Sequence, residues 1–150
     1  MGLIANIKKD LIIPELHATS KKEVLHELAA AVVKQYQGLD EQTLYQILLD
    51  RENLGSTGIG DTVALPHGKI KGFGEIAICF GRSRDGIAYD ALDGKPAHLF
   101  FLLIAPEDTA TSYLNCLAEL SRFLKNAQTR SRLMQAADPN ELLAIFAQTE

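Results

Sequence analysis

One continuous apolar segment constrains the fold of this chain more than any other feature. The run Leu99–Ala105 contains no polar side chain, and Pro106 follows it directly. A strand that is apolar at every position, rather than at alternate positions, is typical of burial on both faces. The run is also far too short to span a membrane. We therefore expect Ala97–Ala105 to form the central strand of a sheet.

Shorter apolar segments predict further strands. These are Leu11–Ile13, Val63–Leu65 and Glu75–Arg82. The turn signals Asp85-Gly86 and Asp93-Gly94 stand between the last of these strands and the central one, so we expect the chain to reverse there.

Helical periodicity accounts for most of the remaining residues. Ser20 and Asp40 are expected to cap two helices, the second of which runs to about Asn53, and Asp138 is expected to cap the last one. A short helix is expected over Gln128–Ala136. The helix after the central strand should bury a stripe composed of Leu114, Leu117, Leu120 (or Ser121) and Leu124.

These elements fit one domain, residues 1–150, of the α/β class: a sandwich in which helices cover both faces of a small mixed β-sheet. The composition, 47% hydrophobic and 23% charged, is that of a globular protein. A net charge of −4 argues against nucleic acid as a partner, because phosphates call for a basic surface. Cys79 and Cys116 are expected to be buried free thiols, which favours a cytoplasmic location in the absence of a signal peptide.

Residues 51–70 contain the densest group of candidate functional residues. Three glycines and two hydroxyl residues stand together there, namely Gly55, Ser56, Thr57, Gly58 and Gly60. Glycines allow a ligand to approach the main chain, and successive free N–H groups can bind an anion. The pattern lacks the lysine of a nucleotide-binding loop, so an ordinary surface turn is the alternative interpretation.

His67 lies between Pro66 and Gly68. Pro66 restricts the backbone on the N-terminal side of His67, and Gly68 leaves the other side of the imidazole open. A neutral imidazole is a good nucleophile near neutral pH. Arg51, at the expected last turn of the second helix, could bind two phosphate oxygens at once. The combination suits phosphoryl chemistry, and from these residues alone a surface turn with an exposed histidine is the competing interpretation.

Other polar residues receive simpler interpretations. We expect Glu52 to be a solvated charge. Asp61 is either a solvated charge as well or helps to set the loop through bonds from its side chain to the main chain. His98 should be a hydrogen-bonded histidine of the core strand. No pair of histidines or cysteines has metal-ligand spacing, so no metal is expected.

The ordered segment Gly-Ser-Thr-Gly-Ile-Gly-Asp-Thr-Val-Ala-Leu-Pro-His-Gly, residues 55–68, resembles the phosphorylation-site signature of a known family. That family is the fructose/mannitol-type enzyme IIA of the bacterial phosphoenolpyruvate-dependent phosphotransferase system. The chain looks most like its nitrogen-regulatory branch. Residues 90–106 resemble the family's central strand and the segment before it, and the similarity covers nearly the whole chain.

The resemblance implies a phosphoryl carrier. His67 would accept a phosphoryl group, through Nε2, from a phosphohistidine on a small phosphocarrier protein. Arg51 would neutralise the phosphoryl oxygens, and Ser56, Thr57 and Gly58 would complete the phosphoryl-binding loop. Transfer between histidines requires no nucleotide, so no cofactor is expected.

Two downstream roles are open, and the chain would act in either by docking to separate proteins without inserting into a membrane. One is a regulatory role, which the nitrogen-branch likeness favours, and the other is transfer to an enzyme IIB for sugar uptake. A non-catalytic ligand-binding regulator is a third alternative.

The chain departs from the family at Tyr113. Relatives commonly open the helix after the central strand with a second histidine, in a His-Leu-x-x-Leu pattern, whereas this chain has Tyr-Leu-Asn-Cys-Leu. A tyrosine stays neutral near pH 7 and offers one hydroxyl donor. We expect the Tyr113 hydroxyl to lie near His67 and to bind the phosphoryl group; simple packing of the ring is the alternative.

Overall fold

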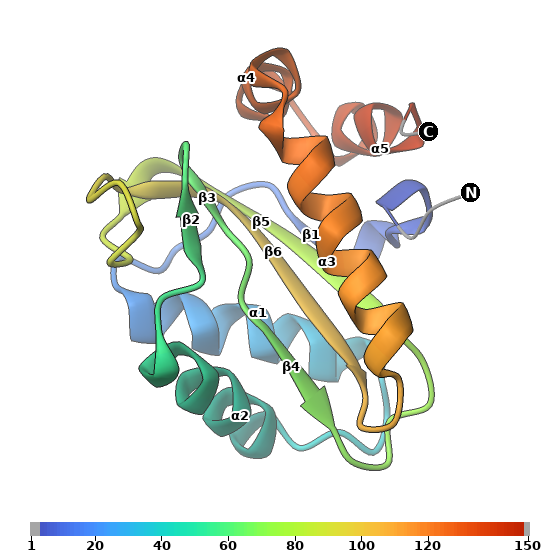
Figure 1. The fold of residues 1–150 in the computed structure, drawn as a ribbon. Coiled ribbons are helices and arrows are strands. Elements are labelled where there is room, and N and C mark those ends of the chain that lie inside the picture. The colour runs from blue at the N-terminus through green and yellow to red at the C-terminus, as the bar shows by residue number, and fades with distance from the viewer. Residues whose placement is uncertain (1–3, 149–150) are drawn as a thin grey trace.

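Strand β6 (Ala97–Pro106) lies at the centre of the sheet, as the apolar run predicts (Figure 1). It pairs antiparallel with β5 (Ala77–Ile87) along one edge. Along the other edge it pairs in parallel with β3 (Val63–Ala64) and then with β4 (His67–Ile70). Leu65 and Pro66 therefore join two short strands that follow the same edge of β6, and this connection brings His67 opposite Leu103.

The computed structural model describes residues 4–148, and within them one sheet of six strands is accompanied by five α-helices. The outer strands are β1 (Ile12–Ile13), parallel to β5, and β2 (Gly58–Gly60), antiparallel to β3. Short 3₁₀ helices cover Ile4–Asn6 and Lys9–Leu11. The predicted mixed sheet is thereby confirmed.

Two separate hydrophobic cores flank the sheet, because successive side chains of a strand point to opposite faces. One face of β6 presents Leu99, Phe101, Leu103 and Ala105 to the core that includes side chains of α3 (Ala110–Lys125), α4 (Ala127–Gln135) and α5 (Pro139–Ala147). The other face presents Phe100, Leu102 and Ile104 to α1 (Lys21–Gln35) and α2 (Glu41–Leu54). Helices on both faces are visible in Figure 1 and match the predicted sandwich.

The helix starts follow the capping signals in the sequence. The side chains of Ser20, Asp40 and Asp138 each accept a hydrogen bond from a main-chain N–H in the first turn of their helix. Glu23, three residues after the Ser20 cap, binds the residue that precedes this cap. The Glu23 carboxylate accepts from the main-chain N–H of Thr19, at 2.9 Å, and also from its hydroxyl.

The buried stripe of α3 agrees with the prediction except at its start. Leu120 and Leu124 are buried and Leu117 packs against the core, as predicted, but Leu114 is 63% exposed. Tyr113 and Cys116 enter the core in its place. Both sets of residues have helical spacing, so periodicity alone did not separate them. The Tyr113 ring therefore faces the core.

The predicted turn at Asp85-Gly86 proves to be an irregularity inside β5. The pairing register with β6 shifts between Arg82 and Ile87, and Gly86 has a φ of +86°. The main-chain N–H of Gly86 donates to the Ser83 hydroxyl at 3.0 Å. The local turn chemistry is therefore present, but β5 resumes pairing with β6 at Ile87.

Gly68 allows α2 to pack closely against β4. A Cβ atom at this position would lie 2.7 Å from Cγ2 of Ile47 on α2, too close for a non-bonded contact. Because side chains alternate along a strand, His67 and Lys69 point to the face opposite Gly68. Packing of α2 on one face therefore leaves His67 directed towards α3.

Cys79 and Cys116 are buried free thiols, as predicted. In the part of the chain that the structure describes, no helix has the length and apolar character needed to cross a bilayer.

Candidate functional site

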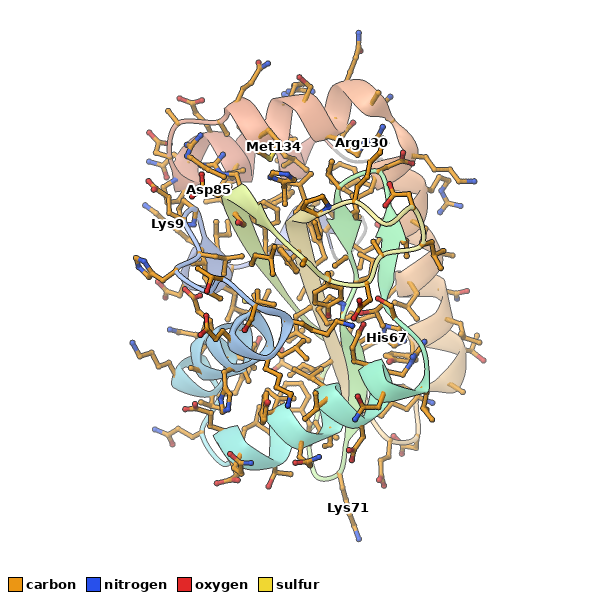
Figure 2. All side chains as sticks on the ribbon, turned by 90° about the vertical axis from the view of Figure 1, so that its left-hand side faces the viewer. Lys9, His67, Lys71, Asp85, Arg130 and Met134 are labelled. Atoms are coloured by element: carbon orange, nitrogen blue, oxygen red, sulfur yellow. The ribbon has the colours of Figure 1, made fainter. Side chains whose placement is uncertain are left out.

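A groove of about 490 Å³ opens beside His67. Its walls come from three elements: Arg51 and Leu54 from the last turn of α2, His67 and Lys69 from β4, and Tyr113 from the first turn of α3. Figure 2 shows His67 close to the end of α2. The structure thus brings together three of the residues singled out in the sequence, namely His67, Arg51 and Tyr113.

The His67 imidazole is oriented by its own backbone. Nδ1 lies 2.7 Å from the carbonyl oxygen of Leu65. A carbonyl oxygen can only accept, so Nδ1 carries the proton in this bond. In the neutral ring the lone pair then resides on Nε2.

The pKa of His67 lies below its ordinary value. Burial, the largest cause, disfavours the charged imidazolium, while the bond to the Leu65 carbonyl opposes this effect. The positive charge of Arg51 lowers the pKa further, and the negative charge of Glu52 raises it. The net result favours a neutral, nucleophilic ring at physiological pH.

Arg51 holds the end of α2. Its Nη1 donates to the carbonyl oxygen of Gly55 at 2.9 Å, so one side of the guanidinium is used within the protein. The other N–H groups have a planar arrangement suited to phosphate oxygens.

Tyr113 packs edge-on against His67. The ring centroids are 5.8 Å apart and the planes are inclined by 61°. Burial raises the pKa of Tyr113 to about 12, partly opposed by the positive charge of Arg51, so the hydroxyl stays protonated at neutral pH. Nζ of Lys69 lies 5.1 Å from the centroid of the Tyr113 ring, which adds a second positive charge to the groove.

Lys69 was not recognised in the sequence, although a signal was available. It stands two residues after His67 in an expected extended segment, and such residues share one face of a strand.

The glycine-rich loop lies outside the lining of this groove. The Ser56 hydroxyl donates to the carbonyl oxygen of Tyr89 at 2.8 Å and accepts from the N–H of Gly58. The Thr57 hydroxyl is buried and donates to the Glu52 carboxylate at 2.6 Å. Gly58 packs tightly, since a Cβ there would lie 2.9 Å from Cα of Ala91. In this structure the three residues bind one another and their protein neighbours.

The expectation for Glu52 was wrong, and of the two alternatives for Asp61 the exposed, solvated charge is the one that the structure supports. Glu52 is only 5% exposed, rather than solvated, and it binds Thr57 and Lys21. Asp61 has a φ of +55°, and its own N–H donates to the Asp93 carboxylate at 3.0 Å. The side chain that fixes this turn is therefore that of Asp93.

His98 is held as predicted for a core-strand histidine, with Nδ1 2.9 Å from the carbonyl oxygen of Ser83. Among residues 4–148, no group of three or more His, Cys, Asp or Glu side chains has an arrangement that could hold a metal ion.

Comparison with known proteins identifies the family of this chain. Residues 5–149 match the family described as "Phosphoenolpyruvate-dependent sugar phosphotransferase system, EIIA 2". A nitrogen regulatory protein of Bradyrhizobium diazoefficiens is 35% identical over 141 residues, which cover 94% of this chain and 92% of that protein. The fructose-specific EIIABC component of Bacillus subtilis is 34% identical over 99% of this chain, which spans 23% of that longer protein.

Among solved structures, the nitrogen regulatory protein IIA-Ntr of Neisseria meningitidis superimposes with a TM-score of 0.90 at 32% identity, over 97% of this chain and 99% of that one. The family match shows that the chain is a histidine-based phosphotransferase. The chain belongs to the EIIA 2 family, and it is a phosphoryl carrier that accepts its phosphoryl group on a histidine.

Proposed function

We propose that His67 is the histidine that accepts the phosphoryl group, and that the donor is a phosphohistidine on a small phosphocarrier protein. The observation that carries this assignment is the bond from Nδ1 of His67 to the Leu65 carbonyl, which leaves the Nε2 lone pair available. Arg51 and Lys69 supply positive charge beside the ring, where a phosphoryl group requires it.

The transfer balances without an external acid or base. The bond between His67 Nε2 and phosphorus forms as the N–P bond of the donor breaks. When the second nitrogen of the donor ring carries a proton, that ring leaves as neutral imidazole. The proton of His67 stays on Nδ1, and its hydrogen bond to the Leu65 carbonyl oxygen stabilises the positive charge that develops on the ring.

Arg51 and Tyr113 are proposed to bind the phosphoryl oxygens directly. Ser56, Thr57 and Gly58 are proposed to contribute by holding the loop that precedes His67, and their hydroxyl and N–H groups would have to exchange partners to reach a phosphoryl group. Leu54, 84% exposed at the groove, provides apolar surface for the docking of a protein donor.

The downstream role is proposed to be regulatory. Support comes from the nitrogen regulatory relative, which matches over nearly its whole length, and from the likeness to IIA-Ntr. Transfer to an enzyme IIB is the alternative, supported by the fructose-specific relative. The chain matches a phosphotransferase family over residues 5–149, so a purely ligand-binding regulator is not needed to explain the chain. The cytoplasmic location expected from the sequence stays a prediction.

Reconstitution with phosphoenolpyruvate, enzyme I and the phosphocarrier protein tests the assignment of His67. We expect one acid-labile, alkali-stable phosphate per chain and none in His67→Ala. His98→Ala is the matched control, because His98 also directs Nδ1 to a carbonyl oxygen but lies on β6. Labelled phosphate in the His67→Ala protein would contradict the assignment.

The two downstream roles are separated by following the phosphorylated protein. Rapid loss of label to a purified enzyme IIB of the host supports sugar uptake. Retention of label, together with partners that copurify with only one of the two forms, supports regulation.

A further inference from the structure

A buried carboxylate, Glu52, lies at the centre of a polar cluster beneath the glycine-rich loop. It accepts the N–H of Thr57 at 3.1 and 3.2 Å and the Thr57 hydroxyl at 2.6 Å. Three acceptor contacts to one neighbouring residue fix both the main chain and the side chain of Thr57. A carboxylate taken out of water requires such partners to remain charged.

A cation completes the charge balance of the cluster. Nζ of Lys21, in the first turn of α1, lies 2.9 Å from Glu52 and 3.0 Å from the Asp90 carboxylate. The same ammonium lies 4.9 Å from the ring centroid of Tyr89, whose hydroxyl is 3.2 Å from that of Thr57. Because the Thr57 proton is donated to Glu52, the Tyr89 hydroxyl donates to Thr57. Three segments distant in sequence therefore meet at Thr57 and Glu52.

A short hydrogen-bonded path leads from this cluster to His67. The carbonyl oxygen of Thr57 accepts the N–H of Leu65 at 2.9 Å. The carbonyl oxygen of Leu65 accepts Nδ1–H of His67 at 2.7 Å. Glu52 immobilises Thr57. Thr57 therefore holds Leu65, which in turn orients the imidazole of His67.

Glu52 also fixes the element that carries the arginine of the groove. The main-chain carbonyl oxygen of Glu52 accepts the N–H of Gly55 at 3.1 Å. Nη1 of Arg51 donates to the main-chain carbonyl oxygen of the same glycine. Glu52 and Arg51 therefore both bind Gly55, the residue at which α2 ends.

We propose that Glu52 is a positioning residue for phosphoryl transfer: through Thr57 and Leu65 it holds the His67 ring with Nδ1 protonated and Nε2 directed to the groove. This role rests on the proposed function of His67. Glu52 does not touch the phosphoryl group, and Lys21 keeps it ionised and in place.

Glu52→Gln is the primary test, since it keeps the shape and one acceptor oxygen but loses the charge. The matched control is Glu23→Gln. The Glu23 carboxylate also accepts the N–H and the hydroxyl of a threonine, Thr19, but it lies on the surface and no hydrogen-bonded path joins it to His67. Thr57→Val is a second variant, which removes only the hydroxyl and should have a smaller effect in the same direction.

Two readouts are required. Long-range ¹H–¹⁵N spectra of the unphosphorylated protein report which nitrogen of His67 carries the proton. Phosphoryl uptake from the phosphocarrier protein reports the rate. In Glu52→Gln we expect partial loss of the Nδ1–H form and uptake slowed by about tenfold or more, the effect of disturbing a buried charged hydrogen-bond network. Glu23→Gln should match the parent in both.

A Glu52→Gln protein that is folded, with the parent's His67 proton position and uptake rate, would overturn the proposal. Slow uptake with an unchanged His67 ring would also contradict it, because the effect would then not pass through the imidazole. If Glu52→Gln fails to fold, Thr57→Val decides by the same two readouts. If the parent accepts no phosphate at all, the proposed function fails, while the spectra of the unphosphorylated ring still test the positioning role.

Discussion

The imidazole of His67 and the carbonyl oxygen of Leu65, two positions earlier in the chain, are joined by a 2.7 Å hydrogen bond. The bond assigns the proton of the neutral ring to Nδ1. It also couples the ring to the backbone that connects β3 to β4, because the N–H of Leu65 is itself bound to Thr57.

The first prediction concerns the site of attachment. Because Nδ1 is bound to the Leu65 carbonyl, the phosphoryl group should be attached to Nε2. Spectra correlating ¹⁵N with ³¹P in the phosphorylated protein identify the bonded nitrogen directly. Attachment at Nδ1 would require this bond to break and would show that the observed ring orientation is not the reactive one.

The second prediction concerns pH. Burial, with the charge of Arg51 in the same direction, lowers the pKa of His67 below its ordinary value of about 6.5. Only the neutral ring attacks, so the rate of phosphoryl uptake should stay constant as the pH falls to about 6.5. Below that pH the rate should decline as the pH passes through the lowered pKa of His67. Arg51→Gln removes a nearby positive charge, so the decline should begin at higher pH. Arg122→Gln, remote from the groove in α3, should leave the profile unchanged.

The third prediction separates charge from geometry at Arg51. Arg51→Lys keeps the positive charge but loses the planar pair of donors, so uptake should slow by about tenfold or more. The free energy of unfolding should change by about 0.5 kcal/mol or less, as for most surface substitutions. Arg122→Lys is the matched control, because Arg122 also lies in the last turn of a helix. Parent-like uptake in Arg51→Lys would argue against two-oxygen binding.

The elements that sequence reasoning found are those encoded by contiguous residues. The apolar run Leu99–Ala105 required a strand buried on both faces, and the structure places it at the centre of the sheet. The helix caps form hydrogen bonds within four residues of their own positions, so they could be predicted from the sequence; these caps are Ser20, Asp40 and Asp138. Local chemistry of this kind does not depend on how the chain packs.

The errors concern residues whose surroundings come from distant segments. Glu52 was expected to be a solvated charge flanking the glycine-rich loop, but Lys21 from α1 and Tyr89 beyond β5 enclose it. Leu114 was expected to be buried because it continues the leucine spacing of its helix, but it is exposed and Tyr113 is buried instead. Neither set of tertiary partners can be read from a local pattern.

The fourth prediction concerns acid stability. Burial raises the pKa of the Glu52 carboxyl, but the hydrogen bonds from Thr57 and Lys21 outweigh it, and the net pKa lies below the ordinary value. A carboxyl with a depressed folded-state pKa stabilises the protein above its unfolded-state pKa of about 4.3 and loses that contribution as the pH falls through the folded-state pKa.

Glu52→Gln has no such titration. The difference in unfolding free energy between the parent and Glu52→Gln should therefore be largest at neutral pH and shrink below about pH 4.3. Urea unfolding at a series of pH values measures this difference. A difference that stays constant from pH 7 to pH 3 would show that the ionised form of Glu52 does not stabilise the fold.

The last prediction concerns Tyr113, which stands where the family resemblance leads us to expect a second histidine. Its ring lies against His67 and its protonated hydroxyl can donate one neutral hydrogen bond to the phosphoryl group. Tyr113→Phe keeps the ring and removes that donor, so uptake should slow by no more than about tenfold, the equivalent of roughly 0.5–1.5 kcal/mol. Tyr45→Phe is the matched control, since Tyr45 has the same 8% exposure but stacks on His26 instead. Equal uptake rates in Tyr113→Phe and Tyr45→Phe would mean that Tyr113 contributes only its ring to the packing of α3 against β4.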